Sequence, residues 1–269
     1  MNPKRDVCVT FDLWETLIAD ESELDVARGR MRCEGIQKVM DGMGIKVPLE
    51  DLQIGYEETD PQLDAAWSRD ENPTPAEQIE LILKAATGGK VSLPQDSQGL
   101  RMLEAAYVDP ILVSPPKLKE EARMALEGVR SRVGRVGLIS NTGRSPAAAL
   151  RQVLEKYGLL RFFDATIFSD EVGSRKPNRR IFETAANQLQ TDLSKMVHVG
   201  DNPEADVWGA KQAGMRAVLL DYDVPESFRK RPTSLFALSR TKHIQDSEIH
   251  PDARIKSLRE VLGYIDSLE

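Results

Sequence analysis

The sequence has 269 residues, 41% of them hydrophobic and 29% charged, which is enough chain for one compact domain with a large insertion or for two domains. A net charge of −7 argues against a nucleic-acid binder with a basic surface. No apolar run approaches about 18 residues and the start of the chain has no export signal, so we expect a cytoplasmic protein without a membrane partner. The two cysteines, Cys8 and Cys33, fit free thiols in a reducing compartment.

The first predicted element is the short β-branched run Val7–Phe11, which is typical of a buried parallel strand. Asp12 follows this strand directly, and Trp14 stands two positions later. Residues 24–112 then carry apolar side chains at spacings of three and four, which predicts a mostly helical region. Within it, turn-forming residues at 94–99 and 109–110 predict loops.

From residue 116 onward, strands alternate with helices. The sequence predicts a helix over 117–130, a helix that begins with Ser145 as N-cap and Pro146 at its first position, and a helix that follows Pro177 and runs through Gln188. The expected strands are 136–140, 165–169, 196–200 and 217–220; a strand around 242–244 would extend the sheet edge, and apolar residues from 255 to 265 predict a last helix. This alternation predicts an α/β fold with a parallel sheet, helices on both faces, and ligands beyond the carboxyl ends of the strands.

Polar side chains stand where those ligands are expected. Asp12 is a carboxylate that can act as a nucleophile and divide one hard displacement into two easier steps. Ser140 and Asn141 offer a hydroxyl and an amide to phosphoryl oxygens, and Lys176 offers a fixed positive charge to the group in transfer. Each pattern alone is also common in ordinary turns, so the argument depends on their combination.

Asp201 and Asp206 add two acids after another strand. Together with Asp12 they would form a cluster that repels itself unless a cation occupies it, and oxygen ligands of this type suit Mg²⁺. Asp206 also fits the first turn of a helix, where the helix dipole favours a negative charge. His198, in the middle of a strand among apolar residues, is expected to be a packed core histidine.

Four stretches, FDLWETL, LISNT, SRKP and VGDNPEAD, resemble in order the four motifs of the haloacid dehalogenase (HAD) superfamily, and the resemblance extends over about residues 6–27 and 117–221. It implies a Rossmann-like core with a helical cap inserted between the first two motifs. We expect a core domain of residues 1–20 and 115–269 and a cap domain of residues 21–114, with hinges near Asp20 and residues 114–116. The resemblance also implies that the backbone carbonyl of Trp14 is the third protein ligand of the metal.

Trp14 departs from the pattern of the family's phosphatases. Those enzymes carry a second aspartate there, which protonates the leaving oxygen and then activates water, a contribution of about 10²- to 10⁴-fold. Haloacid dehalogenases also lack this acid, attack carbon and need no metal. Glu15 is adjacent but replaces the family's usual glycine. A phosphonatase-like enzyme would need a cap lysine, for which the candidates are Lys38, Lys46, Lys84 and Lys90.

Because the acidic cluster is intact, we expect a Mg²⁺-dependent HAD-type hydrolase, a phosphatase of a small phosphorylated metabolite, which forms an aspartyl-phosphate on Asp12. The alternatives are a metal-independent 2-haloacid dehalogenase and a low-activity binding or regulatory protein. The expected partner is an anionic small molecule, and the protein is expected to be a monomer or a homodimer. In the cap, anionic ligands could contact a small set of side chains: Arg28, Arg30, Arg32, Trp67 and Arg69.

Overall fold

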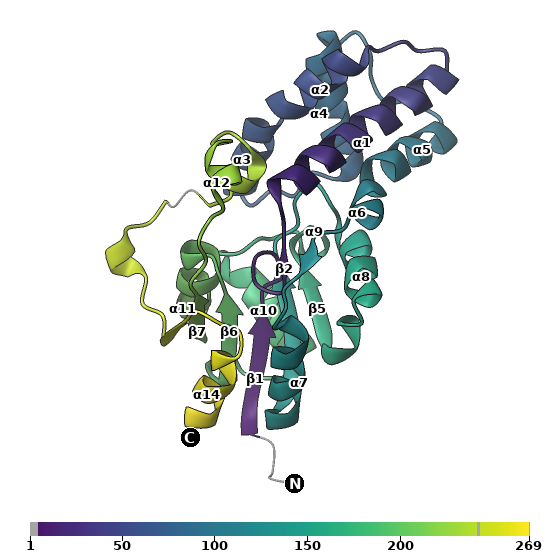
Figure 1. Ribbon diagram of the computed structural model, residues 1–269. Coiled ribbons are helices and arrows are strands. Elements are labelled where there is room, and N and C mark those ends of the chain that lie inside the picture. Colours follow the sequence, from purple (N-terminus) through teal and green to yellow (C-terminus); the bar gives the residue numbers. More distant parts are fainter. Residues whose placement is uncertain (1–4, 241–242, 269) are drawn as a thin grey trace.

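The computed structural model describes residues 5–240 and 243–268 (Figure 1). Its centre is a six-stranded sheet in the order β5-β4-β1-β6-β7-β8, and every neighbouring pair is parallel. The strands are β1 (Arg5–Phe11), β4 (Val133–Ser140), β5 (Ala165–Phe168), β6 (Met196–Gly200), β7 (Arg216–Leu220) and β8 (Ala253–Ile255). The predicted α/β fold is therefore confirmed. Among the described residues, no helix combines the length and apolar character that crossing a membrane requires.

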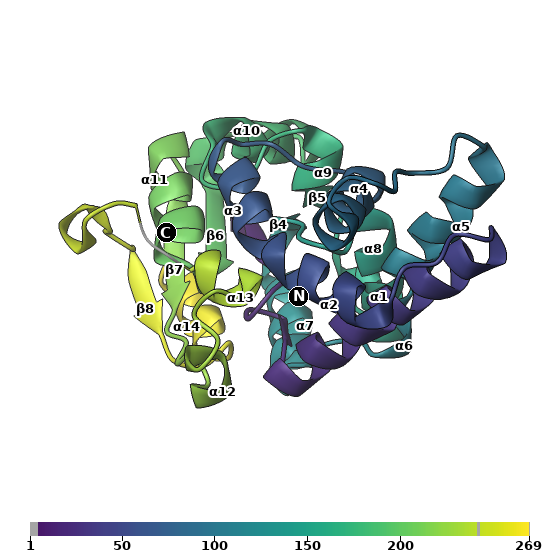
Figure 2. The same cartoon turned by 90° about the horizontal axis from the view of Figure 1, so that it is seen from above.

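Helices cover both faces of this sheet, as Figure 2 shows from above. One face packs against α7 (Ala122–Arg132), α8 (Ala147–Lys156) and α14 (Glu260–Ser267) in a single apolar cluster. A second cluster joins the opposite face to α10 (Arg179–Gln188) and α11 (Gly209–Ala213). Because both faces are buried, residues 7–11 of β1 are all buried, and Val9 among them pairs with Val136 and Val197 on its two sides.

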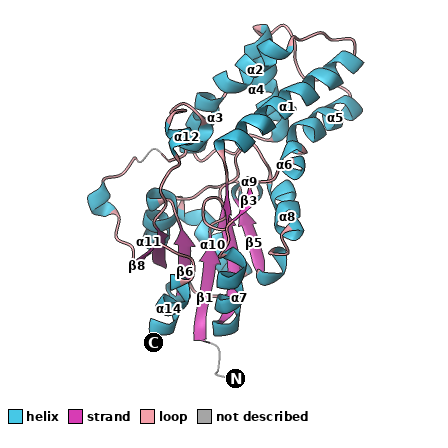
Figure 3. Cartoon of the chain, in the orientation of Figure 1, coloured by secondary structure: helices cyan, strands magenta, loops and turns pink. Residues whose placement is uncertain are grey.

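A helical unit stands above the carboxyl ends of the strands (Figures 1 and 3). It contains α1 (Ser22–Gly42), α2 (Leu49–Glu58), α3 (Asp60–Ser68), α4 (Pro75–Thr87), α5 (Ser97–Val108) and α6 (Pro110–Val113). It has an apolar cluster of its own, in which Ile36, Leu52 and Ile82 are fully buried. These helices pack on one another and face the end of the sheet where ligands bind in this class of fold.

Two short strands connect this unit to the sheet. β2 (Ile18–Ala19) and β3 (Lys117–Leu118) pair antiparallel, so the chain enters and leaves the helical unit side by side. Arg28 joins the two connections, since its guanidinium forms an ion pair with Asp20 and also donates to the backbone oxygen of Ser114 at 3.1 Å. Arg28 therefore has a structural partner on each connection near the expected hinges.

Several expected boundaries are wrong for local reasons. The helix predicted over 117–130 begins only at Ala122, because residues 117 and 118 form β3. Ser145 does not cap α8; its hydroxyl accepts from Arg32 at 3.1 Å, and the Ala147 N–H donates to Asp170 instead. Part of the loop predicted over 94–99 is helical, because Asp96 caps α5 through the Gly99 N–H at 2.7 Å. Residue 110, predicted as loop, begins α6.

The segment between β7 and β8 differs from the expectation as well. Residues 243 and 244 form no strand, and Lys242 lies outside the described residues. The strand at the sheet edge is β8, so Ile255 belongs to a strand and not to the last helix. Residues 222–240, with the short helices α12 (Glu226–Arg229) and α13 (Leu235–Leu238), rise from the end of β7 towards α3, and we call them the strap (Figures 1 and 2).

Candidate active site

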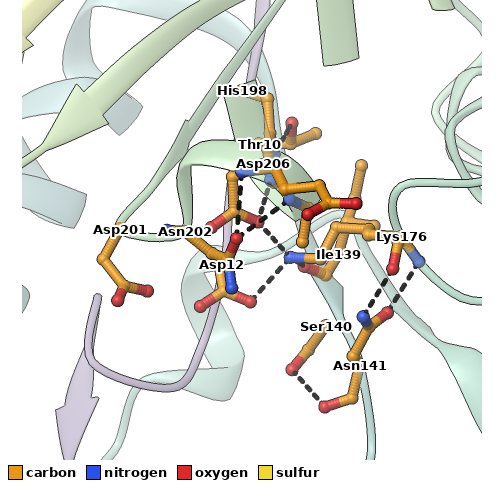
Figure 4. A network of polar contacts seen from close by, with 12 residues as sticks. Thr10, Asp12, Ile139, Ser140, Asn141, Lys176, His198, Asp201, Asn202 and Asp206 are labelled. Atoms are coloured by element: carbon orange, nitrogen blue, oxygen red, sulfur yellow. Dashed lines mark hydrogen bonds and ion pairs between the residues drawn. The ribbon is translucent and has the colours of Figure 1, made fainter. Parts of the chain in front are cut away.

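The side chain of Lys176 lies at the centre of the candidate site (Figure 4). Its ammonium group donates to Asp12 Oδ1 at 2.7 Å, to Asp206 Oδ1 at 2.6 Å and to the backbone oxygen of Ile139 at 2.7 Å. All three donors of the ammonium are thus used inside the protein. Burial opposes the charge, but the two carboxylates outweigh it and hold the pKa of Lys176 above its ordinary value. The residue therefore remains a fixed positive charge beside Asp12.

The ends of the strands place these residues. Asp12 follows β1, and its N–H donates to the Val199 oxygen of β6 at 2.9 Å. Asp206 lies on a single π-helical turn, Pro203–Trp208, and returns to the end of β6, where the Asn202 N–H donates to its Oδ2 at 2.8 Å. This return requires Gly200, since a Cβ there would lie 2.2 Å from the Asp206 carboxyl carbon. The glycine of the last motif thus has a steric role.

Asn141 and Ser140 lie at the end of β4 beside Lys176 (Figure 4). The Asn141 amide donates to the Lys176 backbone oxygen and accepts from the Lys176 N–H, each at 2.8 Å. Asn141 therefore holds the backbone of the loop that carries the lysine. Ser140 is fully buried, and its hydroxyl makes only a long contact of 3.4 Å with the Asn141 oxygen.

The three predicted acids come together. Each of the three acids, Asp12, Asp201 and Asp206, is buried. One carboxylate oxygen from each lies within 4.8 Å of the other two. Burial raises the pKa of Asp12 to about 6 and that of Asp201 to about 8, against the opposing charges of Lys176 and Arg240 respectively. Burial would do the same to Asp206, but Lys176 and His198 hold its pKa well below the ordinary range. Two of the three carboxylates thus lack full compensation, and a hard divalent cation such as Mg²⁺ fits this set of oxygen donors.

Trp14 and Glu15 occupy the turn after Asp12. Trp14 lines the cavity and also packs on a cluster that includes Ile111 of α6 and Val153 of α8. Glu15 is buried in a left-handed conformation with φ of 58°, where the family pattern has glycine. Its Oε1 accepts from the Asp20 N–H at 2.8 Å, and burial raises its pKa. The Glu15 carboxyl thus helps to close the turn that leads to the helical unit.

A cavity of about 1140 Å³ lies between the acids, the helical unit and the strap. Of the cap arginines singled out from the sequence, Arg32 is buried and donates to Tyr107 O, Tyr56 Oη and Ser145 Oγ, whereas Arg30 and Arg69 form exposed pairs with Glu34 and Glu71. Trp67 lies under the guanidinium of Arg175, 4.7 Å from its ring centre. Of the four cap arginines that were expected to contact an anionic ligand, Arg28 and Arg32 are therefore buried, whereas Arg30 and Arg69 are exposed.

Two residues of the site were missed by the sequence reasoning. His198 is buried as expected, yet its Nδ1 lies 2.9 Å from Thr10 Oγ1 and its Nε2 lies 3.2 Å from Asp206 Oδ1. It therefore supports the acid cluster through Asp206. Its position two residues before Gly200, on the same strand, was the available signal. Arg240 donates to Asp201 Oδ2 at 2.6 Å from a segment with no recognisable motif. Nothing in the local sequence indicated that contact.

A family model of haloacid dehalogenase-like hydrolases matches residues 7–214. A glyceraldehyde 3-phosphate phosphatase of Methanothermobacter thermautotrophicus is 37% identical over 103 residues, which are 38% of this chain and 43% of that protein. The chain thus aligns with less than half of the length of that relative.

Solved structures of similar fold cover nearly the whole chain. A 2-haloacid dehalogenase from Pseudomonas syringae pv. Tomato DC3000 has a TM-score of 0.62 with 22% identity, and the match covers 98% of this chain and 99% of that one. A HAD phosphatase from Thermococcus onnurineus has a TM-score of 0.61 with 18% identity, and the match covers 96% and 97%. Since the two scores are nearly equal, the fold alone does not separate carbon–halogen from phosphoryl chemistry.

Proposed function

The chain belongs to the haloacid dehalogenase-like hydrolases, and from this premise we propose that it is a Mg²⁺-dependent phosphatase of a small phosphorylated metabolite. Asp12 is the proposed nucleophile and forms an aspartyl-phosphate. Asp12, Asp201, Asp206 and the Trp14 carbonyl are the proposed metal ligands. We take residues 1–20 and 115–269 as the core domain and residues 21–114 as the cap domain.

The contacts around Asp12 support this role. Lys176 holds one carboxylate oxygen of Asp12 at 2.7 Å and leaves the other for attack on phosphorus. The same ammonium neutralises charge on the phosphoryl oxygens while the ester bond breaks and the aspartyl-phosphate bond forms. Asn141 keeps the lysine loop in place, and Ser140 lies beside it at the end of β4. A bound Mg²⁺ would add Lewis-acid stabilisation of the same charge.

The single observation that carries the proposal is the buried acid cluster. A dehalogenase nucleophile needs one carboxylate with a positive neighbour, and Asp12 with Lys176 already provides that. Asp201 adds a second buried carboxylate whose pKa is raised to about 8, and such a group is costly unless a cation is bound. The glyceraldehyde 3-phosphate phosphatase among the relatives agrees with phosphoryl chemistry.

Dehalogenation of a small haloacid is the second candidate, and Trp14 favours it. Its ring lines the cavity at the position of the missing acid, and halide leaves carbon without protonation. This candidate requires halide release that continues in a chelator. The phosphatase requires the opposite dependence on metal.

The test is hydrolysis of an activated aryl phosphate, whose leaving group needs little protonation. We expect turnover by the wild type with Mg²⁺, none with a chelator, and none by Asp12→Asn. Asp192→Asn is the matched control, because Asp192 is an exposed acid that precedes β6, at the other end of that strand. Metal-independent turnover of the aryl phosphate, or turnover that survives Asp12→Asn, would contradict the proposal.

A further inference from the structure

The connection between β7 and β8 spans residues 221–252, far longer than most connections within an α/β core. Long ordered segments of this kind usually carry function. Here the strap touches the helical unit at two places: Arg231 pairs with Asp25 of α1 at 2.8 Å, and the Leu235 N–H donates to Asp60 of α3 at 3.3 Å. On the core side, Asn202 donates to the Ser239 oxygen at 3.3 Å. The strap thus bridges the two sides of the cavity.

Two cations of the strap line the cavity: Arg231 is paired with Asp25 of the helical unit, whereas Arg240 reaches the acid cluster at Asp201. The guanidinium of Arg240 lies 4.8 Å from the ring centre of Phe236 and 5.0 Å from that of Tyr222. Phe236 is itself stacked on the fully buried Phe228, with 3.8 Å between ring centres. Contacts with two aromatic rings therefore restrict the guanidinium, which reduces the entropy lost when it binds an anion.

The hydrogen bonds of Arg240 are incomplete. Nη2 donates to Asp201 Oδ2 at 2.6 Å, but Nε is buried and finds no acceptor among the described residues. A buried donor without a partner is costly, so the site is arranged for one more acceptor oxygen. Because Asp201 is a proposed metal ligand, a cation at the acid cluster would also share the carboxylate that now balances Arg240.

The strand order separates this cation from the reacting group. Asn141 and Lys176 lie on the β4 side of Asp12, whereas Asp201 and the strap lie on the β6 and β7 side. In the proposed function, the charge of Lys176 serves the transferred group. Arg240, Phe236 and Ser239 line the opposite part of the same cavity, where the rest of the substrate would lie.

We propose that Arg240 binds a second anionic group, a carboxylate, on the non-reacting part of the substrate. This inference rests on the proposed phosphatase function and narrows its substrates to small phosphate monoesters that carry a carboxylate. Arginine suits this task, since its fork of donors matches a carboxylate in a bidentate contact. The strap, in addition to the cap helices, then determines specificity.

The test compares 2-phosphoglycolate with 2-hydroxyethyl phosphate, an ester of similar size without the second charge, and with an aryl phosphate. The wild type should prefer 2-phosphoglycolate over 2-hydroxyethyl phosphate in kcat/KM. Arg240→Gln should raise KM for 2-phosphoglycolate by about tenfold to a hundredfold, the usual loss for a hydrogen bond to a charged group. Because Arg240 also pairs with Asp201, a loss shared by all three esters is divided out: the preference, the ratio of kcat/KM for 2-phosphoglycolate to that for 2-hydroxyethyl phosphate, should fall by a similar factor, and Arg240→Lys should recover part of it.

Arg229→Gln is the matched control, because Arg229 is an exposed arginine of the same strap and should change none of these constants. Equal losses on all three esters, or an unchanged preference in Arg240→Gln, would overturn the inference. Calorimetric binding of 2-phosphoglycolate and 2-hydroxyethyl phosphate to Asp12→Asn, with and without Arg240→Gln, tests Arg240 without turnover. If the wild type hydrolyses no aryl phosphate, the proposed function is wrong. Arg240 would still be supported if Asp12→Asn binds 2-phosphoglycolate more tightly than 2-hydroxyethyl phosphate and the added Arg240→Gln removes that difference.

Discussion

At the scale of single residues, the main question concerns Trp14. It stands at the sequence position of the acid that phosphatases of this family use, and it packs against the apolar cluster that contains Ile111 of α6 and Val153 of α8. The carboxyl of the next residue, Glu15, uses its Oε1 to accept from the Asp20 N–H. A phosphatase built in this way protonates its leaving group poorly, so its rate should depend steeply on how good that leaving group is.

Trp14→Asp should restore part of this proton transfer. We expect its rate on an alkyl phosphate to rise by about tenfold or more over a matched Trp14→Asn variant, with little difference between the two on an aryl phosphate. The comparison with Asn cancels the packing that both variants lose, which for a buried Trp is as much as about 3–5 kcal/mol. Steady-state rates on both esters with Mg²⁺ measure the effect. Equal rates of the two variants on the alkyl ester would show that another group supplies the proton.

At the scale of elements, the loop after β4 and helix α3 meet in a buried ion pair. Arg144 Nη2 donates to Asp60 Oδ1 at 2.5 Å, and its guanidinium lies 3.8 Å from the ring centre of Tyr56. Both charged side chains are almost fully buried. Burial raises the pKa of Asp60, and Arg144 opposes that rise. The pair therefore fixes the helical unit on the core only while both charges are present.

Asp60→Asn should lower the free energy of unfolding by about 3–5 kcal/mol, because it leaves Arg144 buried without its carboxylate. Combining it with Arg144→Met should recover part of that loss, since no unpaired cation remains. Asp64→Asn, on the same helix and only half-buried, is the control and should change stability by about 0.5 kcal/mol or less. Denaturant unfolding of the four proteins measures these differences. A loss in Asp60→Asn no larger than that in Asp64→Asn would refute a fixing role.

The elements that the sequence predicted well are those whose signal is local. The strands β1, β4 and β6 fall within a few residues of the expectation. The errors arise where a distant partner decides. Ser145 has the sequence pattern of a helix cap, but its hydroxyl accepts a hydrogen bond from Arg32 of α1. Lys117–Leu118 has a helical sequence pattern, but it pairs with β2 as a strand. Such contacts depend on how the helical unit sits on the core, which no local pattern records.

At the scale of the whole molecule, the fold brings residues from five separate parts of the chain together at one site. Asp12 and the other two acids follow the neighbouring strands β1 and β6, and Lys176 follows β5 two places along the sheet, so the shared carboxyl edge of a parallel sheet made that convergence predictable. Arg240 was not predictable, because the strap reaches the site through aromatic and polar contacts with no repeated pattern. When all three clustered acids are ionised, they exceed the positive charges of Lys176 and Arg240 by one.

That excess predicts how the whole protein responds to Mg²⁺. A ligand at about a hundred times its dissociation constant stabilises the folded state by about 2.7 kcal/mol, which corresponds to a rise in Tm of about 5–10 °C for a chain of this size. The net charge of −7 could also attract Mg²⁺ to the surface without a site. The scans are therefore run at about 0.15 M salt, where such surface effects are largely screened. Asp201→Asn should abolish the rise and Asp192→Asn should retain it; an equal rise in both variants would assign the stabilisation to the surface and remove the acid cluster as a metal site.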